Sequence, residues 1–246
     1  MSDNFPLRVR DHAPESKAVS AVVLVRTKEE QFHLGLLRGA EAPEPVLHFG
    51  WHRLLHDEPL QQVILENDAL LPSAVILLAL DPLIDETLRV LAGRVARKHA
   101  NRQSDIAFGF GEANATFDRL TGELTNADTA FTCATFVLAM LRSVGVLLVD
   151  VTRWRQPTAE DLDWQRRIGA QLLAWIEARI HGDLERAKAR IEKDIGSLRF
   201  RPTDVAGAAC CAPTTWPTGV DDAQPPADAL IARLPWPNPQ QVSTSA

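Results

Sequence analysis

Cys133 is the first candidate for a catalytic residue in this sequence, because its thiol could act as a nucleophile. It lies near the start of the apolar stretch AFTCATFVLAML, which covers residues 130–141. A thiol becomes a nucleophile when it loses its proton, and a helix N-terminus favours the thiolate because its unpaired N–H groups carry partial positive charge. Free cysteine is also among the residue types most often buried without a chemical role. The stretch alone therefore favours a core thiol, and a nucleophile needs a second group.

Two histidines upstream of Cys133 are candidates for that second group. Residues 46–55 alternate with a period of two, which predicts a strand that places His48 and His52 on one face with Gly50 between them. A cysteine nucleophile needs an imidazole that takes its proton and returns it to the leaving group, and this base can lie far away in the sequence. Either histidine alone is more typical of a strand residue without a catalytic role. Together with the cysteine they predict a nucleophile and its base.

Metal and cofactor chemistry is not predicted. Three histidines recur every four residues between residues 48 and 56, but no cysteine or HExxH pattern accompanies them. Cys210 and Cys211 are adjacent, so the chain lacks the spacing of a disulfide framework, and we interpret them as small residues of a short helix. A redox-sensing thiol would require one of them to approach Cys133. We expect neither a metal nor an organic cofactor.

Composition and charge indicate a globular protein. The chain has 246 residues, of which 46% are hydrophobic, and can bury a sizeable core. Its formal net charge of −6 does not favour binding to nucleic acid or to an anionic membrane. No window reaches the roughly 18 apolar residues of a membrane span, and the first residues lack the apolar segment of an export signal. We therefore expect a cytoplasmic protein with no nucleic-acid partner and no membrane span.

Local patterns predict the elements that must position the cysteine and the histidines. Short apolar and β-branched runs predict strands at residues 19–25 and 32–37, separated by a turn, in front of the histidine strand. Acidic residues before it and basic residues at its end predict a helix over residues 88–98. Capping residues in front of Phe131, with Gly145 at the end, predict a helix that carries the cysteine in its first turn.

The C-terminal part of the chain differs from the rest. Apolar residues at helical spacing predict a helix over residues 162–180, and a charge-dense helix follows over residues 181–201. From Pro202 onward, recurrent prolines favour extended or irregular chain apart from a short helix around residues 205–211. These changes predict a first domain, a helical extension and a Pro-rich, largely irregular tail, over residues 1–155, 156–201 and 202–246.

Two short motifs resemble the circularly permuted branch of the NlpC-type papain-like cysteine enzymes, which includes the lecithin retinol acyltransferase-like proteins. The residues that carry the resemblance are His48-Phe49-Gly50-Trp51 and Thr132-Cys133-Ala134-Thr135-Phe136-Val137. In that family the histidine strand precedes the cysteine helix, and this chain has the same order. The resemblance covers roughly residues 19–150.

The resemblance implies an α+β, permuted papain-like fold in which an antiparallel sheet packs on the cysteine-bearing helix, followed here by the C-terminal helical extension. Cys133 would be the nucleophile, and its backbone N–H would stabilise the oxyanion of the tetrahedral intermediate. His48 matches the family's histidine, but His52 lies farther into the predicted strand, and we prefer it slightly as the base. Four polar residues are in range for the family's third, orienting position: His56, Asp57, Glu58 and Glu66.

The implied function is a cysteine hydrolase, either an amidase or a peptidase, or an acyltransferase that works through an acyl-enzyme thioester. Its substrate would be an intracellular amide, ester or isopeptide, including one within a protein, rather than peptidoglycan. The alternative is a non-catalytic interaction module of the same fold. Its binding surface would be the charged helix over residues 181–201 together with the Pro-rich tail.

Overall fold

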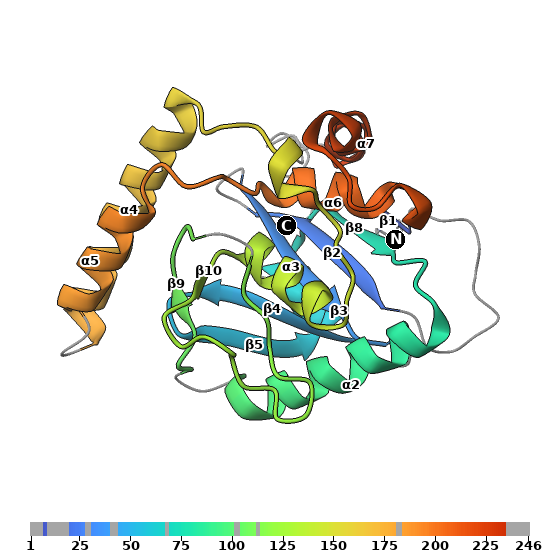
Figure 1. The fold of residues 1–246 in the computed structure, drawn as a ribbon, viewed down its shortest axis with the longest axis horizontal. Helices are drawn as coiled ribbons and strands as arrows, with labels where there is room; N and C mark the ends of the chain where they lie inside the picture. Colours follow the sequence, from blue (N-terminus) through green and yellow to red (C-terminus); the bar gives the residue numbers. More distant parts are fainter. Residues whose placement is uncertain are drawn as a thin grey trace, which may run out of the picture.

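A six-stranded sheet forms the centre of the molecule (Figure 1). The computed structural model describes residues 20–27, 31–39, 44–66, 69–100, 104–111, 114–180 and 184–234, and the backbone of residues 7–8. The strand order is β1-β8-β2-β3-β4-β5, with every neighbouring pair antiparallel except β1 and β8. The strands are β1 (Leu7–Arg8), β2 (Ala21–Arg26), β3 (Phe32–Leu37), β4 (Pro45–Trp51), β5 (Leu54–Pro59) and β8 (Ser73–Leu77).

Alternating side chains give the sheet two buried faces. Val22 and Leu24 of β2 belong to the larger apolar cluster, whereas Ala21 and Val23 of the same strand belong to a smaller cluster on the opposite face. The helices α2 (Pro82–His99), α3 (Cys133–Ser143) and α6 (Pro202–Cys210) contribute buried residues to the larger cluster. The short helix α1 (Leu60–Val63) adds Leu60 to the smaller one. The main core therefore lies between the sheet and these three longer helices.

The remaining elements flank this core. The helices α4 (Ala159–Arg179) and α5 (Leu184–Asp194) pack against each other at one end of the molecule (Figure 1). The short strands β9 (Ala107–Phe108) and β10 (Ala130–Phe131) pair in parallel, and β6 (Leu65–Glu66) pairs with β7 (Ala69–Leu70). Two short 3-10 helices cover Val151–Arg153 and Pro213–Thr215. No helix among the described residues is long and apolar enough to cross a membrane.

The coarse fold expected from the sequence is confirmed. The protein is a mixed α+β structure in which five of the six sheet strands form an antiparallel succession. The cysteine helix α3 contacts β3 and β4 of that sheet. The predicted helix over residues 88–98 lies within α2, and the predicted strand over residues 32–37 coincides with β3. The predicted charged helix over residues 181–201 is shorter, because α5 ends at Asp194.

The predicted histidine strand is wrong in one respect, because residues 46–55 form a hairpin. The strands β4 and β5 pair antiparallel, and His52 and Arg53 form the turn between them. A register shift between Phe49 and Trp51 precedes this turn, and Arg53 has a φ of 59°. No Gly or Asn stands at this left-handed position, so the usual sequence signal of a hairpin is missing. His52 therefore does not share a strand face with His48.

The segment after residue 211 is not irregular throughout, contrary to the expectation. A seventh α-helix of the described chain, α7 (Val220–Arg233), includes Pro225 and Pro226 in its interior. It packs against α6, which in turn contacts β2, β3 and β8. Burial of Ala223 and Leu230 offsets the hydrogen bonds that the two prolines cannot donate. Residues 235–246 lie outside the described residues.

A close contact between α6 and α7 makes Gly207 a sensitive position. A Cβ atom there would lie 2.3 Å from the carbonyl oxygen of Ala223 and 2.9 Å from the Cβ of Ala227. We expect Gly207→Ala to lower the free energy of unfolding by roughly 1–3 kcal/mol because the helices must separate. Urea denaturation measures this change. The control Gly39→Ala, with nothing within 4 Å of the added atom, should stay within about 0.5 kcal/mol of the wild type. Equal stabilities for all three proteins would contradict the prediction.

Candidate functional site

A cavity of about 840 Å³ adjoins the N-terminus of α3. Three strand and helix ends that are distant in the sequence meet there. They contribute Phe32 and His33 from β3, Gly50 and Trp51 from β4, and Thr132 and Cys133 from the start of α3. Residues of α4 and the segment over residues 198–203 complete the lining. Cys133 is thus at the wall of a cavity large enough for a small-molecule ligand or a peptide segment.

The start of α3 is fixed by a capping box. The hydroxyl of Thr132 accepts a hydrogen bond from the backbone N–H of Thr135 at 3.2 Å, and the hydroxyl of Thr135 accepts from the backbone N–H of Thr132 at 2.8 Å. These bonds satisfy N–H groups that a helix start otherwise leaves open. Cys133 lies in the first turn, as the sequence predicts, but the helix begins at Cys133 itself rather than near Phe131.

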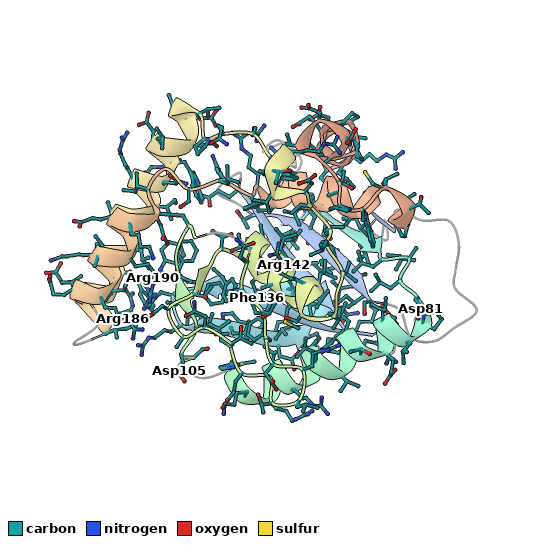
Figure 2. The ribbon with its side chains drawn as sticks, in the orientation of Figure 1. Asp81, Asp105, Phe136, Arg142, Arg186 and Arg190 are labelled. Atoms are coloured by element: carbon teal, nitrogen blue, oxygen red, sulfur yellow. The ribbon has the colours of Figure 1, made fainter. Side chains whose placement is uncertain are left out.

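An aromatic cluster anchors α3 to the sheet and to the neighbouring loops. Phe136, one turn after Cys133, is fully buried in the densely packed interior that Figure 2 shows around it. Its ring centroid lies 6.1 Å from that of Phe49 on β4, 5.8 Å from that of Phe117 and 6.0 Å from that of Phe131. Edge and stacked contacts of this kind hold a helix in a single position. The orientation of Cys133 is therefore set by rigid elements.

Protein surrounds the thiol of Cys133 closely. Burial raises its pKa to about 11, although the backbone N–H groups of Leu34, Ala134 and Cys133 act in the opposite direction. Burial disfavours the charged thiolate because the interior solvates it less well than water. The unliganded site therefore holds a neutral thiol at neutral pH, in contrast to the preformed thiolate that a helix start could favour.

His33 is the histidine that lies at the cysteine's cavity. It belongs to β3 and lines the same cavity as Cys133, and the backbone of the next residue, Leu34, acts on the cysteine sulfur. Its Nε2 atom lies 2.9 Å from Nδ1 of His48. Burial, followed by the charges of His48 and His56, lowers the pKa of His33 to about 3. His33 is therefore a neutral imidazole at neutral pH with one nitrogen bound to a second histidine.

His48 connects His33 to further polar groups on β5. Its ring stacks on that of His56 with a centroid distance of 5.0 Å, and its Nε2 atom lies 3.5 Å from Oε2 of Glu58. Nδ1 of His56 lies 3.4 Å from the other oxygen of Glu58. The carboxylate would favour a charged His48, but burial and His56 dominate and lower the pKa of His48 to about 3. The side chains form a continuous polar chain from the cavity to β5.

His52 has a different environment. It is 1% exposed, and its Nδ1 atom accepts a hydrogen bond from the backbone N–H of Phe108 at 3.2 Å. Its ring centroid lies 6.4 Å from that of Trp175 on α4. His52 is not among the residues that line the cavity of Cys133. The contacts of His52 therefore connect the hairpin turn to β9 and α4.

The residues considered for the orienting position do not all contact His48 in the structure. His56 and Glu58 contact His48, whereas Asp57 accepts two hydrogen bonds from Arg38, at 3.0 and 2.7 Å. The side chain of Glu66 lies outside the described residues. His48 is the residue that hydrogen bonds to the cavity histidine, His33.

A sequence signal for His33 does exist. His33-Leu34-Gly35 repeats the H-x-G spacing of His48-Phe49-Gly50, which carries the family resemblance. In the sheet, Gly35 pairs directly with His48, so the diagonal between the two strands brings the two imidazoles together. The second copy of the H-x-G spacing, at residues 33–35, is thus the sequence signal that indicates His33.

Among the described residues, no group of three or more His, Cys, Asp or Glu side chains could hold a metal ion. None of Cys133, Cys210 and Cys211 forms a disulfide in this structure. The thiol of Cys211 donates to the carbonyl oxygen of Gly207 at 3.5 Å, which is an ordinary contact inside the α6 region. The same thiol lies 3.8 Å from the carbonyl oxygen of Asp222 on α7.

Comparisons with known proteins add no further assignment. No family model, curated protein or solved structure matches the chain.

Proposed function

We propose that the protein is a cysteine hydrolase or acyltransferase with Cys133 as nucleophile, His33 as base and His48 as the orienting residue. One observation carries the proposal: Cys133 and His33 line one cavity, and His33 is hydrogen bonded to a second histidine. The fold would be a permuted papain-like domain, and the substrate a cytoplasmic amide, ester or isopeptide, including one within a protein.

The neighbours of His48 favour one arrangement of protons. Nε2 of His48 has no hydrogen-bond partner among the described residues, and the carboxylate of Glu58, 3.5 Å away, is a negative group beside it. A proton on this Nε2 would be attracted by that carboxylate, which leaves Nδ1 as the acceptor of the Nε2–H of His33. Nδ1 of His33 then carries a lone pair and can accept the thiol proton. An orienting partner that fixes the tautomer of the base is the general requirement for such a nucleophile and base pair.

The chemical step starts from a neutral thiol and a neutral imidazole. As the sulfur of Cys133 bonds to the substrate carbonyl carbon, the thiol proton passes to His33, and the carbonyl electrons move to oxygen. The backbone N–H of Cys133 is a candidate donor to this oxyanion. The carbonyl re-forms as the bond to the leaving group breaks, and His33 returns the proton to that group. Water or a second acceptor then resolves the thioester by the same route.

The proposal predicts a covalent intermediate that can be trapped. Incubation with p-nitrophenyl butyrate and an acid quench should leave one butyryl group on the peptide that contains Cys133, because a thioester survives in acid while deacylation stops. Peptide mass spectrometry measures this adduct. The Cys133→Ala variant should lose it, whereas the control Cys210→Ala should retain it.

Absence of the adduct has a specific meaning. Acylation of Cys133 no faster than that of Cys210 and Cys211 would overturn the proposal. The alternative is then the non-catalytic interaction module, which the raised pKa of the Cys133 thiol favours. In that case the charged helix α5 would belong to the binding surface, with Glu185 and Lys188 among its exposed charges.

A further inference from the structure

Two arginines occupy the wall of the cavity contributed by the segment over residues 198–203. Arg199 and Arg201 both line it. Nη1 of Arg199 and Nη2 of Arg201 donate to the same oxygen, Oδ1 of Asp161, each at 2.9 Å. Because one oxygen atom receives both donors, the two guanidinium groups are held beside each other. Two positive charges therefore share a single buried carboxylate.

Asp161 is a rigid support for this pair. It is 1% exposed, and its second oxygen accepts from the backbone N–H of Thr158 at 3.0 Å and from the hydroxyl of Thr158 at 2.9 Å. Burial opposes its ionisation, but the hydrogen bonds from Thr158, Arg201 and Arg199 outweigh burial and lower its pKa well below the usual range. The carboxylate is thus ionised and cancels only one of the two cations.

The other acidic groups nearby interact more weakly with the two arginines than Asp161 does. The buried Asp204 attracts both of them, but its direct partner is Arg155, at 2.9 Å. Glu160 also lines the cavity and lies 3.8 Å from Nη2 of Arg201, but its side chain is 80% exposed, and ion pairs of that kind are weak. Arg167 adds a further cation to the lining. The Nε atom of Arg201 is enclosed and has no hydrogen-bond partner among the described residues.

Next to the arginines the cavity wall is aromatic. The guanidinium carbon of Arg199 lies 4.0 Å from the ring centroid of Trp164, which packs edge-on against Phe110 at 5.4 Å. Both rings line the cavity. Stacking on the indole limits the movement of the guanidinium and keeps its donors oriented. The wall therefore offers an apolar surface for a hydrocarbon group and a fixed cationic end.

We propose that this cavity recognises an acyl substrate through an anionic group, a carboxylate or a phosphate ester, that Arg199 and Arg201 bind while Trp164 and Phe110 contact an apolar part. The assignment rests on the proposed function for the chemistry at Cys133, but the binding itself does not require that chemistry. Planar guanidinium groups match the geometry of both kinds of anion. Asp161 is a positioning residue in this site.

Isothermal titration of the full chain with three ligands tests the proposal. The ligands are 3-phenylpropanoate, phenyl phosphate and the uncharged 3-phenylpropanamide. We expect at least one anion to bind about tenfold or more tightly than the amide, because charge-assisted hydrogen bonds contribute roughly that difference. The tighter anion identifies which of the two groups the site prefers. Equal affinities for all three ligands would overturn the proposal.

Substitutions locate the preference within the cavity. Arg201→Gln and Arg199→Gln should each reduce the anion-to-amide ratio by about tenfold, while either variant leaves Asp161 with one arginine. Arg201→Lys should restore part of the ratio, since it keeps the charge without the planar fork. The control Arg166→Gln changes an arginine of α4 that pairs with Asp163 and is not among the cavity residues. It should bind like the wild type.

The two proposals fail in different ways. If Cys133 forms no acyl adduct but the anion preference disappears in Arg201→Gln, the anion site stands and the proposed chemistry does not. If the adduct forms but the preference survives in both arginine variants, the anion site is wrong. Circular dichroism checks that each variant is folded. Arg167→Gln, an exposed substitution in the cavity lining, replaces any variant that fails to fold.

Discussion

Replacement of His33 by glutamine is expected to lower kcat for p-nitrophenyl butyrate hydrolysis by roughly 10²–10⁴-fold, the usual contribution of a general base. The substitution removes the group that would accept the proton of Cys133, while glutamine retains a polar side chain in the cavity. KM should change little, because the cavity walls that bind substrate remain. Steady-state kinetics with the purified variant and the wild type measure both constants.

Variants of the other two histidines make this prediction specific. His48→Asn should lower kcat by a smaller factor, since the base remains but loses the partner 2.9 Å from its Nε2 atom. His52→Asn serves as the control, because His52 accepts its hydrogen bond from Phe108 and does not line the cavity. A loss of activity in His52→Asn that equals the loss in His33→Gln would reject the assignment of the base.

Acidification from pH 7 to pH 5 is expected to destabilise the fold through His33 and His48. Burial lowers the pKa of both from 6.5 to about 3, so the unfolded chain binds protons at pH 5 that the folded protein cannot bind. Stability from this source is fully present above about pH 6.5 and is lost as the pH falls from there towards 3. Each histidine should contribute roughly 2 kcal/mol of loss between pH 7 and pH 5.

Urea unfolding at the two pH values measures this loss. The variant that combines His33→Gln with His48→Asn should lose less stability on acidification, by up to roughly 4 kcal/mol, because neither position then takes up a proton in the unfolded chain. Its absolute stability can differ from that of the wild type, so the comparison uses only the change with pH. The same pH dependence in both proteins would show that these histidines do not oppose protonation in the folded state.

Patterns within a few residues determined much of the architecture. The residues before Cys133 predict a helix that starts near Phe131, capped by Thr129 or Asp128, and carries the thiol in its first turn. The helix α3 does carry it there, but it begins at Cys133 and is capped by Thr132. The short apolar run after a turn likewise predicts β3, which covers Phe32–Leu37. These are local effects of caps and side-chain period, so one sequence suffices to predict them.

Contacts between distant segments determined what the sequence did not indicate. The hairpin turn at His52 and Arg53 lacks its usual glycine and is held by hydrogen bonds to the chain around Ile106. The helix α7 contains two prolines and forms where its apolar residues pack on α6. In both cases tertiary contacts outweigh an unfavourable local preference. Hydrophobic periodicity and turn motifs reflect only local preferences, so they do not indicate such contacts.

The candidate site shows the same division. Residue type and helix position by themselves favoured a core thiol at Cys133, and the upstream histidines made it a candidate nucleophile. The proposed partner of that thiol depended on which strand ends meet at α3, and the pairing of β3 with β4 placed His33 at the cavity and His48 behind it. The pKa values of His33 and Cys133 were likewise decided by burial. This burial arises only in the tertiary structure, where the sheet and α3 come together.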